Sequence, residues 1–313
     1  MIERSLGEAE TTEQQAVEAA IARVPAWQGK NARYARIVGG ISNSNWRVAV
    51  EGDQQRYFLK IPGAGTEMFV DRLAANEAAR LAHELGLGPE VVYFDPSDGL
   101  EVAELLEGYV ACTNAEFQKR EIQLAAVDCY RRFHAGDGLR LTKTIFDMID
   151  EHVEQVQELG GSRPEDWPWL TRLYGNARAA FMASGLDMAP CFNDPMPGNF
   201  LIKPGEPMKL VDYEFASMNE RSYELGVWLG EMFFTEDVAA KLIEAYAGEL
   251  RPDFLARVIV MRALADIKWA TWAMVQEQIS LLDFDFHKYG AWKYMRARTV
   301  MHDPRWERWL RTI

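Results

Sequence analysis

In the first third of the chain, hydrophobic and polar residues alternate in short runs, which is the pattern of strands with one buried face. Two turn signals separate neighbouring runs: Gly52-Asp53 and the Pro-Ser-Asp-Gly of residues 96–99. The pattern therefore predicts short strands joined by tight turns. The predicted strands span residues 33–38, 45–51, 56–61, 90–95 and 100–105.

Elsewhere, apolar residues recur at helical spacing. A Thr-Thr-Glu-Gln sequence, which can cap a helix, opens a predicted helix over residues 12–23. The remaining predicted helices span residues 67–86, 115–134, 145–159 and 167–184. A Gly- and Pro-containing break at residues 160–164 separates the last two. The chain thus changes from a strand-rich first part to a helix-rich second part.

Composition places the chain among globular proteins. Its 313 residues are 48% hydrophobic and 26% charged, enough for one large or two ordinary domains. No apolar run approaches the roughly 20 residues that span a bilayer, and the start lacks a signal-peptide pattern, so we expect no membrane partner and a cytoplasmic location. Cys112, Cys129 and Cys191 form no C-x-x-C pair and are expected to be buried thiols.

The net charge of −13 argues against a nucleic-acid partner, which requires basic patches, and suits the attraction of a cationic ligand. Acidity is also common for solubility alone, so the charge by itself selects no ligand. The Trp-rich segment 291–310 is expected to pack on the helical part. A homodimer formed through this segment is the alternative.

An acid, an amide and a second acid lie close together in the helix-rich part. They are Asp194, Asn199 and Asp212, the last within the apolar run Lys-Leu-Val-Asp-Tyr-Glu. Mg²⁺ takes oxygen ligands and usually only one or two carboxylates. Asn199 and Asp212 can supply those ligands, which leaves Asp194 as a base. This is the D-x-x-x-x-N and D-F-G arrangement of protein kinases.

The strand-rich part contains candidate nucleotide-binding residues. The loop between the first two strands is rich in small residues, which let backbone N–H groups approach phosphate oxygens, although Gly-Gly alone is more often a plain turn. Its candidate residues are Gly39, Gly40, Ser42, Asn43 and Asn45. Lys60 lies on the third strand and Glu77 on the following helix. A strand lysine held by a helix glutamate is the kinase device for reaching phosphates, with an ordinary edge lysine as the alternative.

The segment 103–108, Ala-Glu-Leu-Leu-Glu-Gly, joins the two parts of the chain. We interpret it as a hinge whose backbone groups, at Glu104 and Leu106, bind an adenine. His134 ends a predicted helix, and a lone histidine in that place is more often structural than catalytic.

The segments CFNDPMPGNFLI and LVDYEFASMNERSYELGVWLGE resemble the choline and ethanolamine kinases, a branch of the aminoglycoside phosphotransferase group. The resemblance extends to GGISNSNW, KIPGAGTEMFVDR and WATWAMVQEQISLLDFDFHKY, so it covers most of the chain. It implies an α+β, protein-kinase-like fold with two lobes. Residues 1–108 would form a small antiparallel β-sheet lobe with a helix and the hinge, and residues 109–313 a larger, mainly α-helical lobe.

The resemblance also implies roles for individual residues. Asp194 would be the catalytic base, Asn199 and Asp212 would hold Mg²⁺, and Glu214 would assist at the metal or its water. Aromatic residues and the acid Glu231 would surround the substrate's ammonium group. These aromatic residues are Trp269, Trp272, Phe284 and Tyr289.

Physical chemistry supports such a cage, because a quaternary ammonium is best bound by aromatic faces. Trp269 and Trp272 share one helical face, although a Trp pair at this spacing is more often a core stripe. Glu224 and Glu231 lie seven residues apart. One is expected to complete the cage and the other to brace the catalytic loop.

The sequence departs from the family pattern at three places. Phe192 stands where the family usually has His, and Glu224, one methylene longer, where it has Asp. The third departure, Pro195-Met196-Pro197, makes the catalytic loop stiffer and less polar.

The resulting hypothesis is an ATP- and Mg²⁺-dependent kinase that phosphorylates the primary hydroxyl of a small cationic alcohol, choline or ethanolamine. An aminoglycoside, thiamine or another amino alcohol or sugar is the alternative acceptor. A third interpretation is a catalytically inactive nucleotide-binding pseudokinase, which only Phe192 supports. The presence of Lys60, Asp194, Asn199 and Asp212 together argues against it.

Overall fold

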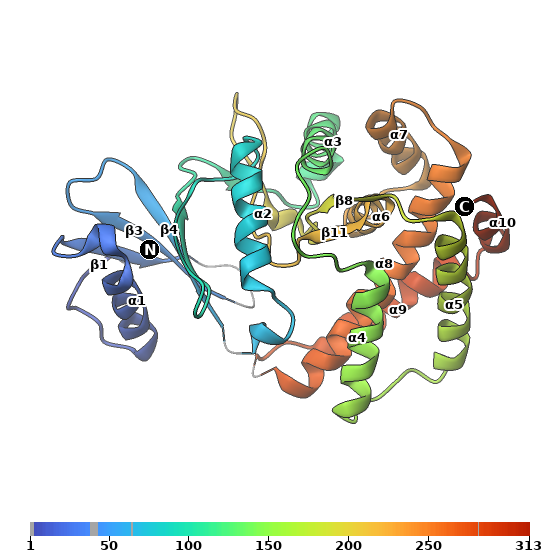
Figure 1. Ribbon diagram of the computed structural model, residues 1–313, viewed down its shortest axis with the longest axis horizontal. Coiled ribbons are helices and arrows are strands. Elements are labelled where there is room, and N and C mark those ends of the chain that lie inside the picture. The colour runs from blue at the N-terminus through green and yellow to red at the C-terminus, as the bar shows by residue number, and fades with distance from the viewer. Residues whose placement is uncertain (1–2, 38–42, 64, 281) are drawn as a thin grey trace.

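The computed structural model describes residues 3–37, 43–63, 65–280 and 282–313. A lobe of strands lies at one end of the long axis and a helical lobe at the other, with the two chain termini at opposite ends (Figure 1). This confirms the predicted α+β, two-lobe architecture. The boundary at residue 108 stays a prediction.

The N-terminal lobe is built on an antiparallel sheet with the strand order β1-β2-β3-β4-β6-β5. Its strands are β1 (Arg4–Ser5), β2 (Ala32–Arg36), β3 (Asn43–Val50), β4 (Arg56–Pro62), β5 (Val91–Asp95) and β6 (Leu100–Glu104). Every strand that the alternation predicts is present. The sequence analysis missed β1, whose two residues are too few for a period-two pattern.

One face of this sheet is covered by helix α1 (Thr12–Arg23), which has the predicted bounds. Thr11 caps it, and a reciprocal bond from Gln14 completes the capping box. The alternation along β3 directs Trp46 and Val48 into the core beneath α1, where they meet Ile21. The predicted pattern thus buries one face of the sheet and leaves the other for the rest of the molecule.

Helix α2 (Arg72–Glu84) lies between the sheet and the helical lobe (Figure 1). It begins five residues after the predicted start, because Thr66–Met68 forms a separate 3₁₀ turn and Asp71 caps the helix by accepting a hydrogen bond from the Ala74 N–H. Its buried residues join the core of the C-terminal lobe, with Ala78 and Ala82 packing in the same cluster as Phe133. The helix therefore connects the two lobes.

The C-terminal lobe is mainly helical. Its helices are α3 (Arg120–His134), α4 (Ile145–Glu158), α5 (Trp167–Ser184), α6 (Arg221–Glu231), α7 (Glu236–Ala247), α8 (Pro252–Ile279), α9 (Phe286–Met301) and α10 (Trp306–Thr312). The predicted helices correspond to α3, α4 and α5, with α3 starting later because a 3₁₀ turn precedes it. In α10, Trp306 is buried in the lobe's core, as expected of the C-terminal segment.

Helix α8 is the central element of this lobe and is buried along most of its 28 residues. It packs against α4, α6, α9 and α10. At Gly226 of α6 an added Cβ would lie 2.7 Å from the Arg262 backbone nitrogen and 2.9 Å from the Val258 carbonyl oxygen. The close approach of α6 to α8 therefore requires a glycine at this position.

Two small sheets fix the loops of the central stretch. Strand β8 (Met188–Cys191) pairs with β11 (Ser217–Glu220), and β9 (Phe200–Ile202) lies between β7 (Val110–Ala111) and β10 (Lys209–Leu210). The segment holding Asp194 and Asn199 thus runs from β8 to β9, and the segment holding Asp212 from β10 to β11. Because the two pairs of strands hold both ends of each loop, the two loops are held next to each other.

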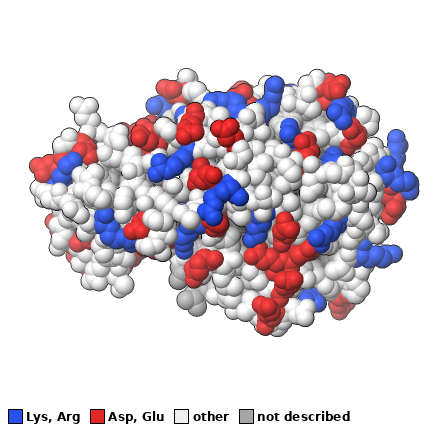
Figure 2. Space-filling view, viewed as in Figure 1, with Lys and Arg blue, Asp and Glu red and all other residues white. Residues whose placement is uncertain are grey.

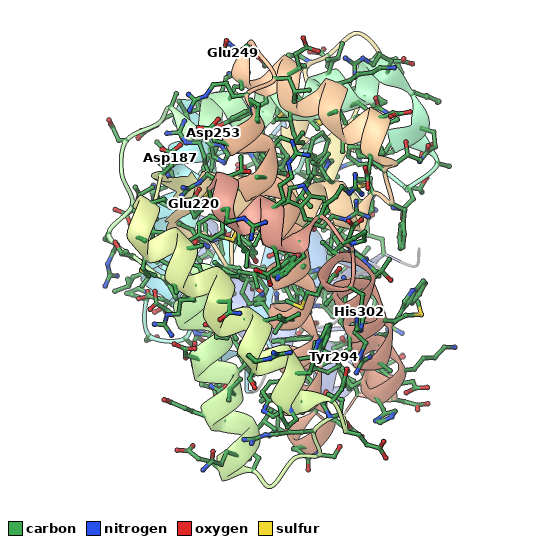
Figure 3. The ribbon with its side chains drawn as sticks, turned by 90° about the vertical axis from the view of Figure 1, so that its right-hand side faces the viewer. Asp187, Glu220, Glu249, Asp253, Tyr294 and His302 are labelled. Atoms are coloured by element: carbon green, nitrogen blue, oxygen red, sulfur yellow. The ribbon has the colours of Figure 1, made fainter. Side chains whose placement is uncertain are left out.

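The buried carboxylate of Glu220 ties this region to the helices. Glu220 Oε2 accepts a 2.6 Å hydrogen bond from the Asp187 N–H and forms a 2.9 Å ion pair with Arg257 of α8. Figure 3 shows Asp187 and Glu220 close together beside the helices of this lobe.

Three general expectations can be compared with the structure. Cys112, Cys129 and Cys191 are buried free thiols, as predicted. Among the described residues, no helix has the length and apolar character needed to cross a bilayer. On the face shown in Figure 2, Lys and Arg side chains are scattered among Asp and Glu side chains.

Candidate active site

The loop that carries Asp194 is anchored from beneath by Glu224 of α6. The fully buried Glu224 carboxylate accepts hydrogen bonds from the backbone N–H groups of Phe192 (2.8 Å) and Asn193 (2.5 Å). Its Oε2 also lies 2.8 Å from His134 Nε2, and His134 Nδ1 lies 2.7 Å from the Tyr246 hydroxyl. Glu224 therefore makes the bracing bonds despite its extra methylene, and His134 holds Glu224.

Two residues of the site have a backbone conformation that is uncommon for residues other than glycine, although Asn and Asp adopt it more readily than most. Asn193 has φ of 66° and Asp212 has φ of 72°, in the left-handed region that favours glycine. The Asn193 side chain donates hydrogen bonds to the Phe215 carbonyl oxygen (2.8 Å) and to Ser217 Oγ (2.9 Å). These bonds link the two loops and hold the conformation that sets the direction of Asp194.

Asp194, Asn199 and Asp212 come together as the sequence analysis expected. Asn199 Nδ2 donates to Asp194 Oδ2 at 3.1 Å, and the Val211 N–H donates to the Asn199 carbonyl oxygen at 3.0 Å, which brings Asp212 alongside. Burial and the nearby Asp212 carboxylate raise the pKa of Asp194. Burial likewise raises the pKa of Asp212, against the opposing effect of Lys60.

This cluster fits a divalent cation. Asp212 Oδ1 is buried, and Lys60 Nζ lies 3.6 Å from it, beyond hydrogen-bond length, so its lone pairs remain available. Glu214 lies two residues further along the chain and is largely buried. The amide oxygen of Asn199 and these two carboxylates are hard oxygen donors of the kind that Mg²⁺ prefers.

Lys60 extends from β4 into the acidic cluster. Its Nζ lies 3.4 Å from Glu214, 3.6 Å from Asp212 and 4.0 Å from Glu101. Burial opposes the charge on this lysine, but the three carboxylates outweigh burial and hold the pKa of Lys60 above its ordinary value. Asn43, at the start of β3, adds a second contact between the lobes by donating to Glu214 Oε1 at 2.7 Å.

The predicted pairing of Lys60 with Glu77 is wrong. Glu77 Oε2 instead accepts a 2.9 Å hydrogen bond from the backbone N–H of Arg140, in the segment before α4. Of the three carboxylates around Lys60, the one from the N-terminal lobe is Glu101, because β6 lies next to β4 in the sheet and places Glu101 opposite Lys60. Strand pairing therefore provides the carboxylate that the sequence analysis assigned to the helix.

The other candidate nucleotide-binding residues lie around Lys60. Asn45 is paired with Lys60 across β3 and β4, whereas Gly39, Gly40 and Ser42 lie outside the described residues. Glu104 ends β6, and its N–H donates to the Glu90 carbonyl oxygen. The Leu106 carbonyl oxygen accepts a hydrogen bond from the Tyr109 N–H where the chain leaves the sheet. An adenine contact at Glu104 and Leu106 stays a prediction.

The four candidate substrate-binding aromatic residues form one continuous group. The rings of Trp269 and Trp272 on α8 lie 5.6 Å apart, and the Tyr289 ring of α9 lies 6.1 Å from both Trp272 and Phe284. Both tryptophans are buried and also belong to the lobe's core. The Trp pair is therefore part of the core, and its role as a cage for the substrate's ammonium group stays a prediction.

Comparison with known proteins identifies the family. The family model for choline/ethanolamine kinase matches residues 34–246. The chain belongs to the choline/ethanolamine kinase family. Members of this family are phosphotransferases with an alcohol group as acceptor.

Individual members of the choline/ethanolamine kinase family are distant in sequence. The chain is 24% identical to human ethanolamine kinase 2 over 298 residues, which cover 86% of this chain and 76% of that one. It is 22% identical to human choline/ethanolamine kinase over 320 residues, covering 84% and 78% of the two chains. Their similarity to this chain extends over both lobes.

Solved structures of the family share the fold. A choline/ethanolamine kinase family protein from Mesorhizobium loti superposes with a TM-score of 0.82 at 27% identity, covering 96% of this chain and 98% of that one. Choline kinase from Streptococcus pneumoniae has a TM-score of 0.73 at 20% identity, covering 93% and 99% of the chains. A spectinomycin phosphotransferase, with a TM-score of 0.54 at 13% identity over 86% and 93%, shares the fold alone.

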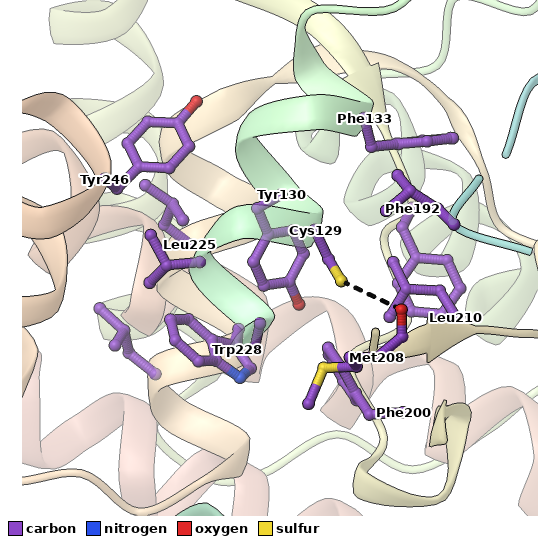
Figure 4. Packing of buried hydrophobic residues seen from close by; sticks show 14 of the residues in the cluster. Cys129, Tyr130, Phe133, Phe192, Phe200, Met208, Leu210, Leu225, Trp228 and Tyr246 are labelled. Atoms are coloured by element: carbon purple, nitrogen blue, oxygen red, sulfur yellow. Dashed lines mark hydrogen bonds between the residues drawn. The ribbon is translucent and has the colours of Figure 1, made fainter. Parts of the chain in front are cut away.

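Phe192, which stands where the choline/ethanolamine kinase family usually has His, packs in the core of this chain. Phe192 is fully buried, and its ring centroid lies 5.2 Å from that of Tyr213 and 6.4 Å from that of Phe200 (Figure 4). Its backbone N–H still donates to Glu224. The substitution therefore keeps the loop anchored, which removes the one observation in favour of a pseudokinase.

Glu231 lies in a different setting from the one expected. Its Oε1 is ion-paired with Lys293 and, at 3.3 Å, with Arg296, both on α9. The Lys293 ammonium itself lies 5.1 Å from the Tyr289 ring centroid. The negative charge that the sequence analysis assigned to the substrate's ammonium is thus already compensated by the protein.

The sequence analysis missed three residues of the site: Glu101, Phe215 and Lys268. The Phe215 ring centroid lies 5.5 Å from that of Trp269, and Lys268 Nζ lies 3.1 Å from the Trp269 ring centroid. The available signal for Lys268 was a charged residue next to Trp269 within a long apolar stretch.

Proposed function

We propose that the protein transfers the γ-phosphoryl group of ATP, with Mg²⁺, to the primary hydroxyl of a small amino alcohol, choline or ethanolamine. The observation that carries this proposal is the convergence of the two lobes on one acidic cluster. Lys60 of the N-terminal lobe lies 3.6 Å from Asp212, and Asn199 donates a hydrogen bond to Asp194 beside it. A homodimer and a cytoplasmic location stay predictions from the sequence.

Each residue has a role that follows from its chemistry. Lys60 is a fixed cation that can bind the nucleotide's phosphates. Asn199, Asp212 and Glu214 would hold Mg²⁺, which supplies positive charge to the phosphate oxygens during transfer. Asp194 orients the acceptor hydroxyl and takes its proton as the new oxygen–phosphorus bond forms and ADP leaves.

Alignment of the reactants contributes more than the basicity of Asp194 in this scheme, because the phosphoryl-transfer transition state is loose. The geometry around Asp194 is suited to alignment. Asn199 donates to both the Asp194 side chain and its backbone carbonyl oxygen, each at 3.1 Å, and so restricts the rotation of the carboxylate. The raised pKa of Asp194 also favours its acceptance of the proton.

The aromatic group supports an acceptor with one compact cation. The faces of Trp269, Trp272 and Tyr289 offer cation–π attraction. An aminoglycoside carries several ammonium groups and needs a wide acidic pocket, whereas here the Glu231 carboxylate is neutralised by Lys293. We therefore favour choline and ethanolamine over the larger polycationic acceptors.

The test is ADP release from ATP and Mg²⁺ with choline, ethanolamine, thiamine and an aminoglycoside as separate acceptors. We expect turnover with choline or ethanolamine and its loss when EDTA removes the metal. Asp194→Asn keeps the shape of the side chain but removes the base, and should reduce turnover by roughly 10²–10⁴-fold.

A matched control is Met196→Ala, which changes an exposed side chain of the same loop and should leave turnover near the wild-type value. Fastest turnover with the aminoglycoside would replace the proposed acceptor. Absence of turnover with all four acceptors, or wild-type turnover in Asp194→Asn, contradicts the proposal.

A further inference from the structure

A buried lysine lies on the aromatic group. Lys268, in the middle of α8, is 1% exposed, and its Nζ lies 3.1 Å from the ring centroid of Trp269 and 4.6 Å from that of Phe215. This nitrogen has no hydrogen-bond acceptor among the described residues. A buried ammonium without an acceptor is costly, so the two ring faces are its main direct contacts.

Lys268 also lies near residues of the proposed reaction site. With Phe215 and Glu214, a proposed metal ligand, it lines a cavity that extends toward α4. Asp194 is the carboxylate that most stabilises the Lys268 charge. The ammonium thus lies against the rings of Trp269 and Phe215 and close enough to the proposed base, Asp194, for their charges to interact.

The charges around Lys268 compensate it only in part. Burial lowers the pKa of Lys268, Asp194 and Glu231 oppose this effect, and nearby Lys143 and Lys293 add to it. The titratable and charged groups that line the cavity or act on Lys268 are Asp71, Lys143, His152, Asp194, Glu214, Glu231 and Lys293. Among them, Lys143 is ion-paired with Glu151 and Lys293 with Glu231, and no ion pair of Lys268 is found in the described part of the chain.

We propose that Lys268 is a specificity-determining residue. Its ammonium competes with the acceptor's own cation for the faces of Trp269 and Phe215, and so reduces the preference for a permanently cationic alcohol over an uncharged alcohol of the same shape. This inference rests on the proposed phosphotransfer to a small alcohol. It follows from geometry, because one aromatic face cannot stabilise two like charges that also repel each other.

The test compares choline with 3,3-dimethyl-1-butanol, in which carbon replaces the quaternary nitrogen. kcat/KM is measured for both alcohols in the wild type, in Lys268→Met and in a control, Lys288→Met, which removes an exposed lysine of α9. In Lys268→Met we expect the ratio of the two kcat/KM values to shift toward choline by roughly tenfold, through a lower KM for choline. The KM for ATP and the ratio in Lys288→Met should stay within about twofold of the wild type.

The inference is overturned if the kcat/KM for choline divided by that for 3,3-dimethyl-1-butanol is the same in Lys268→Met as in the wild type, or lower. If Lys268 had a purely structural role, its replacement would change kcat/KM for both alcohols by the same factor and leave their ratio unchanged. If Lys268→Met does not fold, the wild-type ratio is measured from pH 6 to pH 9, where neither alcohol titrates. The kcat/KM ratio of choline to 3,3-dimethyl-1-butanol should increase with pH as Lys268 loses its proton. A ratio that does not change with pH overturns the inference.

These results separate the inference from the proposed function. Turnover of either alcohol with an unchanged ratio contradicts the role of Lys268 alone. Absence of turnover of both alcohols by the wild type contradicts the proposed acceptor class and the inference with it.

Discussion

The bracing of the catalytic loop by Glu224 gives a quantitative prediction. Glu224 Oε2 accepts from the Phe192 N–H and lies 2.8 Å from His134 Nε2, while Oε1 accepts from the Asn193 N–H. A carboxylate only accepts hydrogen bonds, so His134 donates to Glu224 from Nε2. Replacing Glu224 by Gln puts an NH₂ group in the place of one acceptor.

The expected cost follows from these three bonds. With its oxygen at the Oε2 position, Gln keeps the bonds to Phe192 and His134 but converts both from charge-assisted to neutral, at about 1 kcal/mol each. Its NH₂ group then faces the Asn193 N–H, which is left buried without an acceptor at a further cost of about 1–3 kcal/mol. Removal of one buried charge offsets part of this sum. We expect Glu224→Gln to lower the free energy of unfolding by about 3 kcal/mol.

The same change should slow catalysis. The lost bond is the one that holds Asn193 at its positive φ, directly before Asp194. We expect kcat to fall by roughly 10–100-fold with little change in the KM for ATP, because the contacts of Lys60 are untouched. Glu224→Asp keeps the charge but is one methylene shorter, so both effects should be intermediate.

The assay combines urea denaturation with steady-state ADP release. Glu249→Gln is the matched control, because Glu249 lies exposed at the surface and loses the same charge (Figure 3). The midpoint of unfolding should shift in Glu224→Gln without a change in slope, and the control should behave like the wild type. If Glu224→Gln unfolds within about 0.5 kcal/mol of the wild type and turns over normally, the bracing role is refuted.

Two further predictions concern the lysines of the site. Glu101→Gln should raise the KM for ATP severalfold, because it removes a carboxylate beside Lys60. Glu77→Gln should leave this KM unchanged. A larger effect of Glu77→Gln than of Glu101→Gln on the KM would support the pairing of Lys60 with Glu77 instead. Lys268→Met should increase stability at pH 7. The unfolded lysine holds its proton up to about its ordinary pKa of 10.5, whereas burial lowers the pKa in the fold to about 7. Between these pH values the unfolded wild type therefore binds more protons than the folded wild type, so the free energy of unfolding of the wild type should rise with pH and approach that of the variant. The measurement is the urea midpoint of both proteins at pH 7 and pH 9. An equal difference between the two proteins at both pH values would contradict this prediction.

The periodicity of the sequence predicted the architecture well, because it reports local requirements. Alternation along β3 follows from the burial of one face of the sheet, and the capping sequence at Thr11 fixed the start of α1. The close spacing of Asp194, Asn199 and Asp212 was equally informative. Short paired strands at both ends of their two loops leave these residues little freedom to separate.

The errors arise where the answer depends on tertiary contacts. Glu77 and Glu101 both follow Lys60 in the chain, and the pairing of β6 with β4, which the sequence does not specify, is what places Glu101 opposite Lys60. Glu224 and Glu231 share a helix face at a spacing of seven, so the sequence could not divide their roles. The structure divides them by what lies opposite: backbone N–H groups for Glu224, and Lys293 with Arg296 for Glu231.

Lys268 was missed for a related reason, since a single charge within an apolar helix is easily interpreted as a surface position. Its burial becomes understandable from the other charges of the site. The carboxylates of Asp194, Asp212, Glu214 and Glu101 lie around the cations of Lys60 and Lys268, so the described part of the site has an excess of negative charge. Such an excess is unfavourable in the free protein: repulsion between the carboxylates adds to burial, the larger cause, in raising the pKa values of Asp194 and Asp212, and a bound divalent cation relieves it. The fold therefore gathers buried charges where the proposed phosphoryl transfer would require a metal, a base and a cationic partner for the phosphates.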